Sequence, residues 1–343
     1  MKHLLNTLYV LSPENSLSLD NENVVVKRKS AELARFPLHT LEAIYCFTYA
    51  GATPALMGSC VEKGINLVFY SPYGRFLARA TGYERGNVLL RMTQFRISDN
   101  KELSCKVGKN FLIGKIYNAK WVLERATRDH PDRVPVDKIK SASALLTEAM
   151  TDIKTCEDLD TLQGIEGKAA QVYFQCFDFL ILQQKEEFVF SDRNRRPPLD
   201  RVNALLSFAY SILTRDCEAA LEGVGLDPYI GFIHRQRPGR RSLALDLIEE
   251  LRASYADRFV LYCINQRIMK PEHFIVQQSG AVMLNDDGRK QFFSEWQKRK
   301  SDMITHPFLK EKICWGLVPY VQALLLARTL RGDLEEYPPF FWK

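Results

Sequence analysis

Short apolar runs separated by turn residues fill roughly the first hundred residues of the chain. Strands bounded by Pro, Asn and Asp produce this pattern. Two turn signals stand out, Pro13-Glu14-Asn15 and Asn21-Glu22-Asn23. The strands that we expect occupy residues 5–11, 16–26, 40–47, 65–70, 76–81 and 88–92, with a helix at 53–63. Together these elements predict a small β-rich domain that ends near Asp99.

From Asn100 onward the apolar residues recur with helical spacing. A short hairpin at 274–284, centred on Ser279-Gly280, interrupts the helical part. We expect an α+β protein, with residues 1–99 forming the β-rich domain and residues 100–343 forming a larger, mostly α-helical domain. The predicted helices are residues 101–128, 141–149, 159–182 as one or two helices, 202–221, and a pair within 307–330.

The apolar spacing of residues 242–252 predicts a helix that carries two acids on one face. Leu243, Leu247 and Leu251 recur every four residues and mark its buried stripe, while Ser242 is placed to cap its N-terminus. Asp246 and Glu249 are three residues apart, so they share a face on which two carboxylates can converge on a cation. Glu250, one residue further, points elsewhere.

A histidine and an arginine-rich loop precede this helix. An apolar approach segment leads to His234, and Pro238-Gly239 then forces a turn. Guanidinium groups suit phosphate oxygens. On the local pattern alone, the ordinary interpretation is favoured: a core or surface histidine, a solvated loop, and acids that complement the helix dipole. The arginines of this loop are Arg235, Arg237, Arg240 and Arg241.

Two further segments carry candidate chemistry. Small residues surround Glu166, which suits either close approach by a ligand or plain helix packing. A second arginine cluster, stiffened by Pro197-Pro198, leads to Asp200, which is placed to cap the next helix. It is either a second phosphate-contact strip or an exposed interhelical loop. Its arginines are Arg193, Arg195 and Arg196.

Composition adds limits without naming an activity. With 343 residues, 46% of them hydrophobic, the chain can bury a large core, and its net charge of +6 favours a polyanionic partner without requiring one. Eight cysteines without a C-x-x-C pair predict reduced thiols in a cytoplasmic protein. No apolar run is long enough for a membrane span. The aromatic ending, residues 337–343, is expected to dock on its own domain.

Three segments in order resemble the CRISPR adaptation integrase family, the universal CRISPR-associated endonuclease of spacer acquisition. They are GIEGKAAQVYF around Glu166, RNRRPPLDRVNALLSFAYSIL over 193–213, and GLDPYIGFIHRQRPGRRSLALDLIEELR over 225–252. The resemblance covers essentially the whole chain. The last segment and the PPFFWK ending look most like the branch found in type I-C systems.

The resemblance implies a β-rich domain that mediates dimer formation and a helical domain that carries the active site. It implies that Glu166, His234 and Glu249 are the metal ligands, with Asp246 as an accompanying catalytic acid and Mg²⁺ or Mn²⁺ as the cofactor. Some members have aspartate where this chain has Glu249. The division of roles between Asp246 and Glu249 therefore stays open.

The implied activity is metal-dependent integration of short DNA fragments, in which a 3′-hydroxyl attacks a phosphodiester of the repeat array. The two arginine loops would hold the backbone of double-stranded DNA. The implied partners are a second copy of the chain and the small second CRISPR adaptation protein. Two other functions are weighed against this one: a non-catalytic nucleic-acid-binding protein and a small-molecule metallohydrolase.

Overall fold

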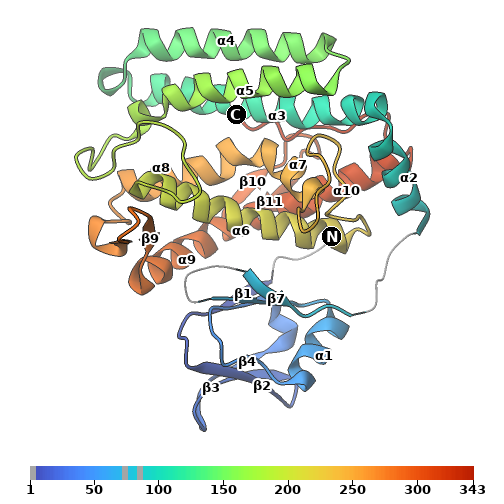
Figure 1. Cartoon of the computed structure of the whole chain (residues 1–343), viewed down its shortest axis with the longest axis vertical. Helices are drawn as coiled ribbons and strands as arrows, with labels where there is room; N and C mark the ends of the chain where they lie inside the picture. The colour runs from blue at the N-terminus through green and yellow to red at the C-terminus, as the bar shows by residue number, and fades with distance from the viewer. Residues whose placement is uncertain (1–4, 72–75, 83–87) are drawn as a thin grey trace. The chain divides into compact units, whose positions relative to one another are not determined.

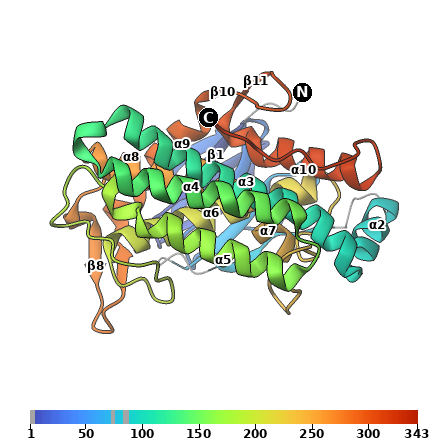
Figure 2. The ribbon, with the colours of Figure 1, turned by 90° about the horizontal axis from the view of Figure 1, so that it is seen from above.

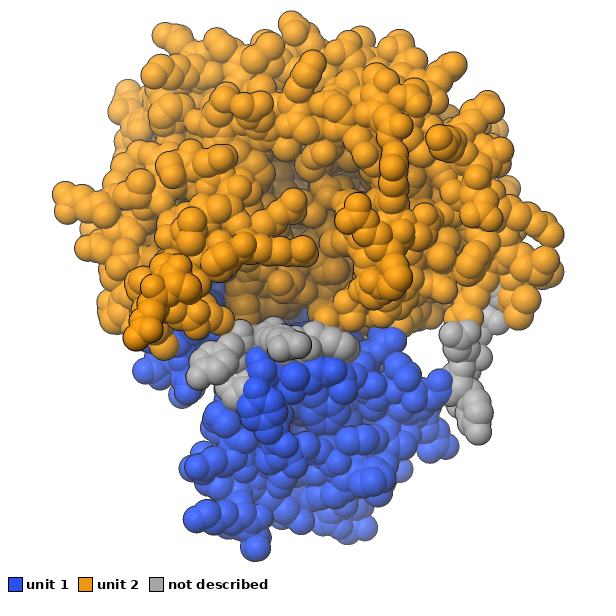
Figure 3. Space-filling model, in the orientation of Figure 1, with its two compact units in different colours: residues 1–85, 284–302 blue, residues 86–283, 303–343 orange. Residues whose placement is uncertain are grey.

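The computed structural model describes residues 5–71, 76–82 and 88–343, which separate into two compact units (Figures 1 and 3). Unit 1 comprises residues 1–85 and 284–302, and unit 2 comprises residues 86–283 and 303–343. Strands dominate the N-terminal region, and helices dominate the rest of the chain. The predicted α+β class is therefore confirmed.

Unit 1 holds two small sheets. In the four-stranded sheet, β1, β5 and β6 are parallel and β7 is antiparallel to β6, whereas the three-stranded sheet is a meander of β2, β3 and β4. Helix α1 (Pro54–Lys63) connects β5 to β6. The strands are β1 (Asn6–Val10), β2 (Asn15–Asp20), β3 (Asn23–Arg28), β4 (Ala31–Pro37), β5 (Leu41–Cys46), β6 (Asn66–Tyr70) and β7 (Phe76–Arg79).

Local sequence signals set the boundaries of these elements. Thr53 caps α1 by accepting a hydrogen bond from the Leu56 amide, and Gly64 ends it with φ +70°, the left-handed conformation that favours glycine. The turn from β2 to β3 is the predicted one at residues 21–23. Strand β4 was not predicted because its side chains are almost all exposed, so no apolar alternation marks it.

Helix α9 (Asp286–Ser301) completes unit 1 although some 200 residues separate it from the strands. The ring of Phe293 stacks on that of Tyr9, with centroids 4.1 Å apart. The buried ammonium of Lys300 lies 2.8 Å from the Glu42 carboxylate. An aromatic contact and an ion pair therefore fasten this late helix to the sheet.

Unit 2 is built around the long helix α3 (Lys101–Asp129), which is side by side with α4 and α5 and also packs on α7 (Figures 1 and 2). The predicted helices at 101–128 and 202–221 and the hairpin at 274–284 are confirmed. The other elements are α4 (Val136–Thr155), α5 (Leu159–Gln175), η3 (Phe177–Leu180), α6 (Arg201–Gly223), α7 (Ser242–Leu251), the π-helix η4 (Arg252–Asp257), α8 (Arg258–Asn265), β8 (Phe274–Val276), β9 (Val282–Leu284) and α10 (Val318–Leu330).

Two predictions about elements were wrong. Residues 88–92 belong to helix α2 (Val88–Asp99), in which Leu90 and Gln94 are buried one turn apart while Leu89 is exposed. The apolar run there reflects a half-exposed helix rather than a strand. Residues 307–330 contain one α-helix, α10, because β10 (Met303–Thr305), β11 (Lys312–Cys314) and the 3₁₀ turn η6 (Trp315–Leu317) precede it.

The C-terminal segment docks on its own unit, as predicted. Tyr337 and Phe340 are buried, and the Tyr337 ring lies 4.8 Å from that of Phe111 on α3. The Asn118 side chain donates to the Phe340 carbonyl at 2.7 Å and accepts from the Trp342 amide at 2.9 Å. Among the described helices, none is long and apolar enough to cross a membrane.

Candidate active site

Side chains from three helices of unit 2 meet at one point. Lys115 of α3 is ion-paired with Glu166 of α5, and its Nζ lies 2.7 Å from Glu249 Oε2 of α7. The exposed fractions of these side chains are 14%, 25% and 5%. Glu166 and Glu249, two of the three acids that the sequence singled out, therefore converge on a lysine ammonium, whereas Asp246, predicted to share this role with Glu249, binds the histidine loop instead.

The second oxygen of Glu249 faces two more nitrogen atoms. Arg252 Nη2 lies 3.0 Å from Glu249 Oε1, and His234 Nε2 lies 3.8 Å from the same atom. Burial raises the pKa of Glu249, but Arg252, Lys115 and His234 outweigh it and lower the pKa to about 2. Glu249 is therefore an anion at neutral pH.

Lys115 shows the complementary effect. Burial lowers its pKa, but the carboxylates of Glu249 and Glu166 outweigh that effect, so the pKa is raised above its ordinary value. The lysine is therefore an ammonium ion held between two carboxylates.

Asp246 holds the histidine loop rather than the cation. Its fully buried carboxylate accepts hydrogen bonds from the backbone amides of Phe232, Ile233 and His234 at 2.5, 3.1 and 3.0 Å. Its Oδ1 also lies 2.6 Å from His234 Nδ1. Because a carboxylate can only accept, Nδ1 donates, which leaves Nε2 on the side of Glu249.

The loop reaches Asp246 because residue 231 is glycine. A Cβ at Gly231 would lie 2.7 Å from Asp246 Oδ2 and 2.8 Å from the backbone of Ser242. From the other side, Gln163 Nε2 donates to the Ile233 carbonyl at 2.7 Å. The chain just before His234 is therefore clamped between α5 and α7.

The predicted capping role of Ser242 was wrong. Helix α7 begins at Ser242 itself, and the residue in the N-cap position is Arg241. The Ser242 hydroxyl donates to the Arg235 carbonyl at 3.3 Å. Ser242 already lies in the first helical turn, so its hydroxyl binds the arginine loop instead of capping the helix.

The π-helix η4 follows α7 and adds a second polar cluster. Arg252 lies over the Tyr210 ring, 5.0 Å from its centroid. At the other end of η4, buried Asp257 accepts from the hydroxyls of Tyr210 and Tyr173 at 2.5 and 3.0 Å. Burial raises the pKa of Asp257 to about 6, although the two tyrosines and two arginines, Arg193 and Arg252, oppose that shift. Short π-helical segments within α-helices are frequent at functional sites.

The predicted DNA-binding arginines divide into two groups. Arg193 points inward, donating to Asn203 Oδ1 at 2.6 Å and lying over the Tyr210 ring, and Arg241 lies 2.6 Å from Glu218. Arg240 is half-buried. The exposed members are Arg195, Arg196, Arg235 and Arg237. Of these four, Arg235 also donates to Asp160 Oδ1 at 2.8 Å.

Glu166, Glu249 and His234 offer donor atoms that suit a hard divalent cation, and the Lys115 ammonium lies between the two carboxylates. Within the ranges that the structure describes, no group of three or more acidic, histidine or cysteine side chains is arranged to hold a metal ion. Two carboxylates and an imidazole fit Mn²⁺ well and Mg²⁺ acceptably.

Sequence reasoning missed Lys115, Arg252 and the Tyr173–Asp257–Tyr210 cluster. Arg252 is three residues after Glu249, so helical spacing could have found it. Lys115 lies on a long helix with several other lysines, and only the packing of α3 against α5 and α7 distinguishes it.

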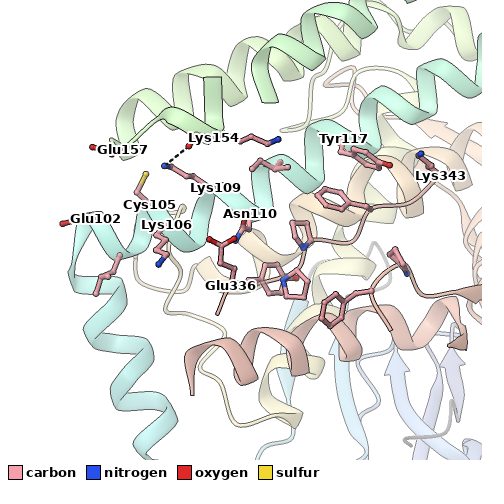
Figure 4. A pocket seen from close by; sticks show the side chains of 18 of the residues that line it. Glu102, Cys105, Lys106, Lys109, Asn110, Tyr117, Lys154, Glu157, Glu336 and Lys343 are labelled. Carbon is pink, nitrogen blue, oxygen red and sulfur yellow. Dashed lines mark hydrogen bonds between the residues drawn. The ribbon is translucent and has the colours of Figure 1, made fainter. Parts of the chain in front are cut away.

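A groove of about 1120 Å³ occupies the other side of α3, against the C-terminal segment (Figure 4). Lys109, Ile113 and Tyr117 line it and recur every four residues, so they share one helix face. Lys115 falls between these positions on the opposite face. The groove is therefore separate from the candidate site.

Comparisons with known proteins agree with the resemblance seen in the sequence. Residues 8–298 match the family described as CRISPR associated protein Cas1. Over 343 residues and the full length of both chains, the protein is 44% identical to CRISPR-associated endonuclease Cas1 1 of Chlorobaculum tepidum.

Two solved structures share the fold. A casposase bound to integration product superposes with a TM-score of 0.84 at 21% identity, covering 99% of this chain and 95% of that one. A Cas6-RT-Cas1–Cas2 complex gives a TM-score of 0.80 at 22% identity, covering 100% of this chain and 36% of that one. At these identities the two superpositions establish the fold.

Proposed function

The chain belongs to the Cas1 family, and from this premise we propose that it is a DNA endonuclease and integrase of CRISPR spacer acquisition. It would insert short DNA fragments into the repeat array by attack of a 3′-hydroxyl on a phosphodiester. The observation that carries the proposal is the convergence of Glu166 and Glu249 on one cation beside His234 Nε2.

The proposed cofactor is Mg²⁺ or Mn²⁺, held by Glu166, Glu249 and His234. When bound, such an ion polarises a phosphate oxygen and stabilises the negative charge that develops during phosphoryl transfer. The site needs no serine or cysteine nucleophile, because the attacking group belongs to the DNA.

The chain's own residues supply orientation and charge. We assign Asp246 a positioning role, since it fixes the loop and the imidazole of His234. Arg252 keeps Glu249 deprotonated from within one helical turn. Glu166 is the more exposed of the two carboxylates and lies on the side from which a phosphate would approach.

The exposed arginines Arg195, Arg196, Arg235 and Arg237 are the proposed contacts to the DNA backbone. Guanidinium contacts to phosphates carry little sequence information and make affinity fall steeply with salt. Arg193 and Arg241 are better placed to hold the loops than to touch DNA, since both make inward hydrogen bonds. Their proposed contribution to DNA binding is therefore indirect, through the loops that carry the exposed arginines.

The proposed partners are double-stranded DNA, a second copy of the chain and the small second adaptation protein, Cas2. The two solved structures described above support DNA and Cas2 as partners, because one is a casposase bound to integration product and the other is a complex that includes Cas2. We assign dimer formation to the β-rich N-terminal region.

A strand-transfer assay tests the proposal. A short duplex is incubated with a repeat-bearing plasmid and Mg²⁺ or Mn²⁺, and joined products are quantified. We expect Glu166→Gln and His234→Ala to lower the rate at least about 100-fold, because each removes a ligand of the charge-stabilising ion. Glu157→Gln, an exposed acid lining the groove on the other side of α3, serves as the matched control.

Undiminished transfer in either site variant would overturn the site assignment. DNA binding without any metal-stimulated transfer by the unmodified protein would instead favour a nucleic-acid-binding protein that lacks chemistry.

A further inference from the structure

Lys115 stands where the metal of the proposed function would stand. Its Nζ is ion-paired with Glu166 and lies 2.7 Å from Glu249 Oε2. We propose that Lys115 is an internal competitor for the divalent cation, which holds the two carboxylates together in the metal-free protein and leaves them when metal and DNA bind. The inference rests on the proposed function.

Charge balance supports this competition. In the metal-free arrangement the carboxylates of Glu166 and Glu249 are matched by the cationic groups of Lys115 and Arg252. A divalent ion added to these four paired groups would leave an excess of positive charge, which the nearby Asp246 carboxylate offsets only in part. Such an excess is costly at low dielectric. Either a cationic group leaves or a phosphate arrives.

Lys115 is the group that can leave. Arg252 is fixed by two contacts, an ion pair with Glu249 and stacking over the Tyr210 ring. The lysine ammonium ends a flexible four-carbon stem, and the described contacts that hold it are the two carboxylates. These are the same oxygens that the metal would need.

The surroundings restrict where the ammonium can go. The cavity beside Lys115 has only about 30 Å³ of space, and its lining includes Arg252 and Asp257 besides apolar residues. That is room for about one water molecule, too little for the end of a lysine side chain. The partly exposed side at Glu166 remains, and there the ammonium would meet a phosphate oxygen of bound DNA.

Metal and DNA should therefore help each other to bind. Metal displaces the ammonium, and the phosphate gives the displaced ammonium a new partner. Such coupling is reciprocal, because linkage requires each ligand to change the affinity for the other by the same factor.

The test is an Mn²⁺ titration followed by the electron paramagnetic resonance signal of the free ion. Three forms of the full chain are compared: unmodified protein, Lys115→Met and Lys109→Met. Lys109 lies on the groove face of the same helix and is the matched control. Removing the competitor should tighten Mn²⁺ binding at least about tenfold in Lys115→Met and leave Lys109→Met unchanged.

Two further variants keep the result interpretable. Lys115→Gln retains a hydrogen-bond donor without the charge, so it should bind Mn²⁺ more tightly even if Lys115→Met folds poorly. The double variant Lys115→Met, Glu166→Gln should lose the gain, which places the tight ion at the candidate site. Equal or weaker Mn²⁺ binding by folded Lys115→Met and Lys115→Gln would overturn the inference.

Strand transfer by the unmodified protein, measured on the same preparation, separates this inference from the proposed function. If transfer is present but neither lysine variant binds Mn²⁺ more tightly, only the competitor role fails. If transfer is absent, the proposed function fails whatever the metal titration shows.

Discussion

At the scale of single residues, the candidate site depends on the absence of a Cβ at Gly231. Gly231 lets the chain pass within contact distance of the Asp246 carboxylate, which then collects the amides that lead to His234. Any larger side chain at position 231 would have to displace a buried, fully hydrogen-bonded acid. The orientation of His234 therefore follows from glycine at 231 as much as from Asp246.

Replacing Gly231 with alanine should destabilise the fold and disorder the site. The added Cβ would lie 2.7 Å from Asp246 Oδ2, and such overpacking typically costs about 1–3 kcal/mol. Urea unfolding would measure the loss. Gly167→Ala is the control: nothing lies within 4 Å of a Cβ there, so alanine should stabilise α5 by about 0.5–1 kcal/mol. Equal effects of the two substitutions would contradict this account.

The sequence predicted the anionic half of the site better than the cationic half. Helical spacing placed Asp246 and Glu249 on one face, and family resemblance added Glu166 and His234. Nothing in the local pattern indicated Lys115, because its partners come from two other helices. The separate roles of Asp246 and Glu249 also needed three-dimensional structure, since both acids follow the same spacing rule.

At the scale of elements, the π-helix η4 joins the site to the interior. It places Arg252 beside Glu249 at one end and buries Asp257 between two tyrosines at the other. Helices α5 and α6 supply those tyrosines, so one carboxylate ties three elements together. In a regular α-helix, Arg252 and Asp257, five residues apart, would lie on different faces of the helix.

Asp257 should make stability depend on pH. Its pKa is raised from 3.8 to about 6, so between these values the folded state binds more protons than the unfolded state. Stability then falls as pH rises through that window, and the cost is fully present above about pH 6. Relative to Asp257→Asn, the unmodified protein should gain about 1–3 kcal/mol on going from about pH 7 to about pH 4. Urea unfolding across that range checks this, and a constant difference would contradict it.

Element prediction succeeded where the sequence carried helical periodicity or a turn signal. The apolar spacing predicted helix α6, the Ser279-Gly280 turn predicted the hairpin of β8 and β9, and the structure has both. Strand β4 is exposed along its length, and α2 has only two fully buried side chains, so neither showed a one-sided apolar pattern. Both elements form because other elements bind them: β4 pairs with the preceding strand β3, and Gln94 of α2 donates to the Asp227 carbonyl, which is distant in sequence.

At the scale of the whole chain, the C-terminal segment fastens the core of unit 2. Phe340 is buried, its amide donates to Glu250 Oε2 at 2.7 Å, and its carbonyl accepts from Asn118. Glu250 is the neighbour of Glu249, and Asn118 lies one turn beyond Lys115 on α3. The end of the chain thereby ties together the two helices that carry most of the charge at the site.

Truncating Phe340 to alanine should cost about 3–5 kcal/mol of unfolding free energy, as expected for a fully buried ring. Its neighbour Phe341 is 37% exposed, so Phe341→Ala should cost less than about 1 kcal/mol. Thermal or urea unfolding of both variants measures the contrast. Similar losses would mean that the segment is not anchored at Phe340.

The central claim is that Glu166, His234 and Glu249 form one metal-binding centre from which Lys115 is displaced. The most direct measurement is an anomalous difference map from Mn²⁺-soaked crystals of the protein with a short DNA duplex. We expect a single strong peak about 2.0–2.3 Å from the two carboxylates and His234 Nε2, with the Lys115 ammonium moved to a DNA phosphate. No peak between these side chains, with Lys115 still paired to Glu166 and Glu249, would contradict the account.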